Sequence, residues 1–155
     1  MNKSCNFFRT TGTIEATFNQ GPWNIGTINK LLHVKLSGSI FAATTEYVTS
    51  TFYLDNPSLW GVEMIAHGDT PLDLVDGAND SRWIGQGAIQ LFEDVIQVGG
   101  SETDFFYNIQ TTLAWEWFGQ VPVADDVDFY LAIANAWDTG AGWSVAGMLQ
   151  VDWAL

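Results

Sequence analysis

The chain has 155 residues, of which 47% are hydrophobic and 15% charged, and its net charge is −13. This composition excludes an intrinsically disordered chain, because it provides enough apolar surface for one folded domain. The acidic excess disfavours binding to nucleic acid or to an anionic membrane. The lone Cys5 excludes an intrachain disulfide and a cysteine-based zinc site. No apolar run reaches the roughly 18 residues of a membrane-spanning helix.

The charges are divided unevenly along the chain. Residues 1–36 carry four of the five bases against one acid (+3), whereas residues 37–155 carry seventeen acids against one base (−16). A basic segment is attracted to an acidic surface, including that of another copy of the chain. We therefore expect one domain, in which a basic N-terminal arm with the first strands (1–36) precedes an acidic body (37–155). Lys3 and Arg9 are the expected assembly contacts of the arm.

Alternation of apolar and polar residues with period two predicts strands along most of the chain. In chain order, the first predicted strands are 13–18, 31–36, 39–44, 47–54 and 60–66. The sequence of residues 67–82 is typical of a long loop. Segment 89–98 fits either a strand or a helical stripe, and its flanking glycines and β-branched residues favour a strand. Residues 105–118 predict a long strand with one apolar and one mainly polar face.

The C-terminal segment carries the pattern of a β-hairpin. A glycine-rich turn at residues 138–142 separates two apolar runs, and pairing Trp137 with Trp143 also pairs Leu131 with Leu149 on one apolar face. The opposite face is small and apolar, where a solvated sheet normally carries polar residues. We expect another subunit to cover it, or alternatively an N-terminal segment of the chain itself. The residues of this face are Ala132, Ala134, Ala136, Ala146 and Met148.

About eight antiparallel strands at this length predict an all-β fold, an antiparallel β-sandwich with a jelly roll as the leading topology. The strand count, the aromatic strand at 105–118 and the apolar C-terminal hairpin together resemble the jelly-roll subunits of virus and phage particles. The trimeric modules of the tumour-necrosis-factor and C1q type share this plan. The resemblance implies a non-enzymatic structural subunit that forms homo-oligomers or assembles with other structural proteins.

Such a subunit would be a capsid, decoration or tail component of a virion or a comparable assembly. The N-terminus lacks the apolar run of a signal peptide, so we expect assembly in a host cytoplasm.

Two other functions remain as alternatives. Trp23, Trp60 and Trp83 lie beside predicted turns, where exposed indoles could form a glycan platform, so a carbohydrate-binding or receptor-binding module is the second hypothesis. Glu63 and Glu116 lie beside aromatic residues on predicted strands, and a retaining glycosidase holds two carboxylates roughly 5 Å apart. A small glycoside hydrolase is therefore the third hypothesis. Because no phosphate loop, nucleophile elbow or dinucleotide fingerprint occurs, we expect no enzyme and no cofactor.

Two acidic clusters in predicted loops are weak candidates for a bound cation. Carboxylate oxygens are the ligands that Ca²⁺ prefers, but neither cluster has EF-hand spacing, and carboxylates in loops commonly cap turns. We therefore expect no metal site. The residues of the two clusters are Asp73, Asp76, Asp80, Asp125, Asp126 and Asp128.

Overall fold

The computed structural model describes residues 2–13, 17–43, 58–74, 80–89, 95–97, 105–134 and 142–155. Within these ranges almost every residue lies in a strand, and all strand pairs are antiparallel, which confirms the predicted all-β antiparallel fold. The strands are β1 (Asn2–Thr13), β2 (Thr17–Ala43), β3 (Ser58–Ala66), β4 (Trp83–Ile89), β5 (Val95–Gln97), β6 (Phe105–Ala134) and β7 (Gly142–Ala154). Among the described residues, no helix is long and apolar enough to cross a membrane.

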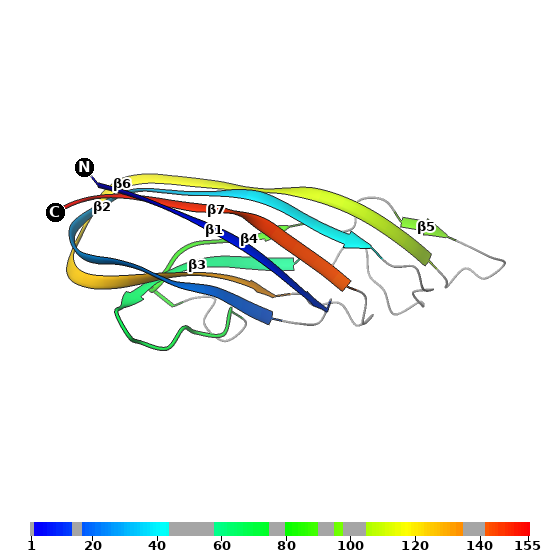
Figure 1. The fold of residues 1–155 in the computed structure, drawn as a ribbon, viewed down its shortest axis with the longest axis horizontal. Helices are drawn as coiled ribbons and strands as arrows, with labels where there is room; N and C mark the ends of the chain where they lie inside the picture. The colour runs from blue at the N-terminus through cyan, green and yellow to red at the C-terminus, as the bar shows by residue number, and fades with distance from the viewer. Residues whose placement is uncertain are drawn as a thin grey trace.

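Two long strands, β2 and β6, turn back on themselves and divide the sheet into two layers (Figure 1). Layer A contains β1, β7, residues 30–43 of β2 and residues 105–122 of β6, in that order, with β5 beyond β6. Layer B contains residues 17–28 of β2, residues 125–134 of β6, β3 and β4. The two layers face each other as a β-sandwich.

The turn in β2 and β6 coincides with irregular pairing between them. Their register shifts four times between Gln20 and His33, and each shift is a β-bulge or a similar irregularity. Bulges add local twist and bend a strand. Gly26, with φ of +77°, and Ala124, with φ of 54°, adopt the left-handed conformation at the same place. The bend therefore follows from backbone features that an apolar–polar pattern does not record.

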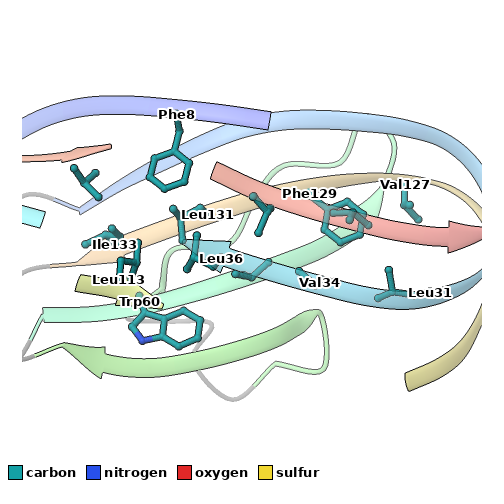
Figure 2. Packing of buried hydrophobic residues seen from close by; sticks show 14 of the residues in the cluster. Phe8, Leu31, Val34, Leu36, Trp60, Leu113, Val127, Phe129, Leu131 and Ile133 are labelled. Carbon is teal, nitrogen blue, oxygen red and sulfur yellow. The ribbon is translucent and has the colours of Figure 1, made fainter. Parts of the chain in front are cut away.

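The core lies between the two layers and takes apolar side chains from both. Val34 and Leu36 of layer A and Phe129 and Leu131 of layer B are almost fully buried in one cluster (Figure 2). Phe8 of β1 joins the same cluster. Burial of each such side chain contributes about 1.5–3 kcal/mol relative to leaving it exposed. The sandwich is thus stabilised mainly by strands that are far apart in the sequence.

The predicted C-terminal hairpin is not formed. Both runs are strands, and their apolar residues point into the core as expected, but Leu131 pairs with Val62 and Gln20, whereas Leu149 pairs with Leu36 and Asn6. The two runs lie in opposite layers. Their apolar faces therefore meet across the core and not side by side.

Several predicted strands have different limits from those expected. The strands at 60–66 and 105–118 are confirmed within β3 and β6, and the segments 31–36 and 39–43 belong to one continuous strand, β2. The segment 13–18 spans the end of β1 and the start of β2. Of the segment 89–98, residues 95–97 form β5, while the predicted strand at 47–54 lies outside the described residues.

The basic N-terminal segment is part of the sheet. Residues 2–13 form β1, which pairs along its whole length with β7 and is an edge strand of layer A. Residues 2–13 of the expected basic arm are thus a strand of the sheet. Lys3 and Arg9 are nevertheless exposed on this strand.

Candidate assembly surface

The outer face of layer A is built from alternate residues of four neighbouring strands. The registers of β1, β7, β2 and β6 align these residues in rows that run across the sheet. The two central rows contain small and apolar side chains and a single charge. They are Phe7, Met148, Ser37 and Ala114, and then Arg9, Ala146, Ser39 and Thr112.

These central rows form an uncovered apolar surface. The side chain of Phe7 is 81% exposed, and Ala146 beside it in the neighbouring row is also exposed. Phe7, Arg9, Ser37, Ala146 and Met148 help to line a shallow, open groove of about 520 Å³. A solvated sheet face usually alternates core residues with charged or strongly polar ones. The middle of this face therefore lacks the composition of a surface that is exposed only to water.

Two glycines beneath this face hold the strands close together. Gly38 of β2 pairs with Gly147 of β7, and a Cβ atom added to either one would contact the backbone of the other strand. The ring of Phe8 lies 3.0 Å from the position of such an atom at Gly147. The aromatic ring therefore fills, from the core side, the space that the missing side chains leave.

A histidine flanked by two carboxylates occupies one end of the face. Nδ1 of His33 lies 3.0 Å from Asp152 Oδ2, and Nε2 of His33 lies 3.0 Å from Glu116 Oε1. The imidazole stacks on Phe118 with 4.3 Å between ring centroids. This arrangement links β2, β6 and β7 across layer A. The three polar residues are far apart in sequence: His33 and Asp152 pair in one row beside the bulge between Leu31 and His33, and Glu116 lies in the next row, opposite Lys35.

A second polar cluster lies where β2 and β6 bend. Asn24 Nδ2 donates hydrogen bonds to Asp126 Oδ1 at 2.8 Å and to Asp128 Oδ1 at 2.9 Å. His67 Nδ1 lies 3.0 Å from Asp128 Oδ1, and the backbone N–H of Gly68 donates to the same carboxylate. The cluster connects the end of β3 to the bends of the two long strands.

The hydrogen bonds in this cluster shift two pKa values. The hydrogen bond to Asp128, followed by the charges of Asp128 and Asp126, raises the pKa of His67 above its usual 6.5. Burial alone would raise the pKa of Asp128, but its hydrogen bonds from His67, Asn24 and Gly68 outweigh burial and lower the pKa below 3.8. The His67–Asp128 contact is therefore a charged pair over the range between these values.

The residues expected to form an interface divide into two groups. Lys3, Arg9, Ala146 and Met148 lie together on the outer face of layer A. Ala132 and Ala134 do not, because they are 0% and 4% exposed beneath Leu74 and Trp83 of the same chain. This corrects the expectation that another subunit covers them. Ala136 lies outside the described residues.

The two glutamates considered as a glycosidase pair point away from each other. Glu63 is fully buried on the outer side of layer B, where its carboxylate accepts hydrogen bonds from Arg82 and from the backbone N–H of Leu72. Glu116 lies on the outer face of layer A beside His33. The core separates them, so they cannot flank one glycosidic bond.

The expected tryptophan platform is largely inside the fold. Trp60 and Trp83 are buried, and Trp23 is half-buried with its ring 6.1 Å from that of Phe8. The faces of two of the three indoles are therefore not available to a sugar ring.

The acidic residues considered as cation ligands have other surroundings. Asp80 accepts the backbone N–H of Arg82, and Asp125 accepts that of Asp126, as turn-capping carboxylates do. Asp73 is exposed, and Asp76 lies outside the described residues. In the part of the chain that the structure describes, no group of three or more His, Cys, Asp or Glu residues could hold a metal ion.

The described residues together define an all-β sandwich protein in which the outer face of layer A presents exposed apolar side chains in its central rows. No protein-family model matches the chain, and no curated protein matches it. A chain in a structure titled "Structure of infectious bursal disease virus Gx strain" has 12% sequence identity and a TM-score of 0.35, over 96% of this chain and 32% of that chain. The present chain thus spans about a third of the length of that neighbour.

Proposed function

We propose that this protein is a non-enzymatic structural subunit that assembles, through the outer face of layer A, into a virion or a comparable large particle. The observation that carries the proposal is the pair of central rows on that face. Their small and apolar side chains permit close approach by another layer, and they leave an apolar groove beside an exposed phenylalanine. Apolar patches of this kind mark sites of protein association.

The connections between strands support a jelly-roll topology, which we propose as the finer description of the fold. When β2 and β6 are each divided at their bends, the described residues form eight strand segments in chain order, apart from the short β5. The first pairs with the eighth, the second with the seventh, the third with the sixth and the fourth with the fifth. The third also pairs with the eighth, and the fourth with the seventh. This is the pairing of a rolled-up double hairpin.

Jelly rolls occur in viral capsids, in lectins and in cupins, so the topology alone does not select a function. The surface favours the structural role. Two of the three tryptophans that a lectin-like platform would use are buried, and the two candidate catalytic glutamates lie on opposite sides of the core. The uncovered face of layer A, in contrast, is available to a partner.

The test is the solution mass of the wild type and of Ala146→Glu, measured by light scattering over a range of concentrations. We expect the wild type to form oligomers, and we expect the variant to remain monomeric and folded, because an unpaired charge would be buried in the contact. Ala88→Glu places the same charge at an exposed alanine on β4 of layer B and is the matched control. A wild type that is monomeric at every concentration, with purified protein that forms no particles, would contradict the proposal.

A further inference from the structure

The outer surfaces of the two layers carry charges of opposite sign. On the outer side of layer A, exposed Lys3 and Arg9 lie on β1, and exposed Lys35 lies on β2. Among the described residues, the acids of this face are Glu116 and Asp152, each 3.0 Å from a ring nitrogen of His33, so the face carries three bases against two carboxylates. The edge formed by β1 contains no acid at all among its residues 2–13.

Layer B is covered on its outer side by residues 67–74 and 80–82, between β3 and β4, which we call the covering segment. Leu72, Leu74 and Trp83 pack on Ala132 and Ala134 of β6. Hydrogen bonds also hold the covering segment in place. The buried carboxylate of Glu63 accepts hydrogen bonds from the backbone N–H of Leu72 and from the side chain of Arg82. Arg82 also donates to the carbonyl of Thr70 at 3.0 Å. This segment is therefore a defined surface of the sandwich.

The surface of the covering segment is acidic. Asp69 and Asp80 are exposed on it, as is Asp73. The one arginine of the segment, Arg82, is balanced by the buried charge of Glu63. A basic, partly apolar face and an acidic face thus lie on opposite sides of the same molecule.

We propose that the partner of the layer A face is the acidic covering segment of a second copy of this chain, in a head-to-tail contact. This inference rests on the proposed function and names the partner of the same surface. Complementary charges favour this arrangement. A symmetric contact between two layer A faces would instead bring Lys3, Arg9 and Lys35 of both copies together, and like charges across an interface are unfavourable. Head-to-tail contacts repeat, and they generate rings or extended arrays as a particle requires.

Charge reversal tests the pairing directly. Lys3→Glu/Arg9→Glu reverses the layer A face. Asp69→Lys/Asp80→Asn reduces the acidity of the covering segment, and the asparagine side chain keeps an oxygen that can accept the N–H of Arg82. At about 0.05 M NaCl we expect each double variant to weaken self-association about tenfold, and we expect the difference from wild type to fall at about 0.5 M NaCl. In the chain that carries all four substitutions the reversed layer A face meets a covering segment that is no longer acidic, so it should associate more strongly than Lys3→Glu/Arg9→Glu alone.

The outcomes separate this inference from the proposed function. If Ala146→Glu and Lys3→Glu/Arg9→Glu abolish assembly while Asp69→Lys/Asp80→Asn has no effect, the layer A face is used but its partner is not the covering segment, and the inference is wrong. If the four-fold variant associates no better than Lys3→Glu/Arg9→Glu, the inference is also wrong. If the wild type itself never associates, the proposed function fails. Circular dichroism on every variant confirms that the sandwich remains folded.

Discussion

The outward-facing alanines at the end of β6 are buried in layer B, whereas one on β7 is exposed in layer A. Ala132 and Ala134 on β6 and Ala146 on β7 all occupy outward positions of strands whose alternate residues fill the core. In layer B the chain folds its own covering segment over the alanines. In layer A the corresponding face stays exposed, with Phe7 and Met148 beside Ala146. An outward-facing row of small residues therefore does not by itself indicate whether the chain folds a segment of its own over that face.

The largest expected effect on stability comes from placing a glutamate at an outward-facing alanine of each layer, in two separate variants. Ala134→Glu buries an unpaired carboxylate under Leu74 and Trp83, and we expect it to destabilise the isolated subunit by roughly 3–5 kcal/mol. Ala146→Glu lies on the exposed face and should change the stability of the monomer by less than about 0.5 kcal/mol. Urea denaturation of both variants measures the difference. Equal stability of the two would refute the distinction between the layers.

Removing the hydrogen bonds that Glu63 accepts from the covering segment should have an intermediate effect on stability. Glu63→Ala leaves Arg82 and the N–H of Leu72 without their buried acceptor, so we expect a loss of about 2–4 kcal/mol. In Glu63→Ala, amide hydrogen exchange should accelerate relative to wild type more in residues 67–74 and 80–83 than in β7. Glu116→Ala removes a half-exposed glutamate from layer A and is the control, with a loss below about 1 kcal/mol. Unchanged exchange in the covering segment of Glu63→Ala would show that apolar packing alone holds it.

The smallest effect concerns pH and the bend that joins the layers. The pKa of His67 is raised above 6.5, so its contribution to stability is fully present below pH 6.5 and is lost as the pH rises through the folded pKa. The pKa of Asp128 is lowered below 3.8, so its contribution is present above pH 3.8 and is lost as the pH falls through the folded pKa. His67→Gln should therefore differ most from wild type between pH 3.8 and 6.5.

The control for this prediction is a double-mutant cycle. In the Asp128→Asn background, His67→Gln should produce no such maximum, because the charged partner is gone. Urea denaturation from pH 3 to pH 9 provides the measurement. A difference between wild type and His67→Gln that does not vary with pH would contradict the ion pair.

The candidate surface could be predicted only in part. Alternation alone places Lys3, Arg9, Ala146 and Met148 on the side of their strands that faces away from the core, because it is a local property of a strand. That this side is an assembly interface stays a prediction. The grouping of His33 with Glu116 and Asp152 gave no signal in the sequence. These residues are brought together by a bulge and by three strands that are distant along the chain. The ion pair between Glu63 and Arg82 likewise gives no signal in the sequence, because it forms only when the covering segment folds over layer B.

The alternation of side chains with period two is enough to predict an all-β chain and the apolar side of most strands, because it does not depend on which strands are neighbours. The pairing of the strands, in contrast, depends on the three-dimensional fold. Phe129, Leu131 and Ile133 match Val145, Leu149 and Val151 in pattern, and this match would suit a hairpin or two strands that face each other across a core. The bends in β2 and β6 select the second arrangement. They depend on bulges and left-handed residues that lie outside the alternating pattern, and they bury both apolar faces at once.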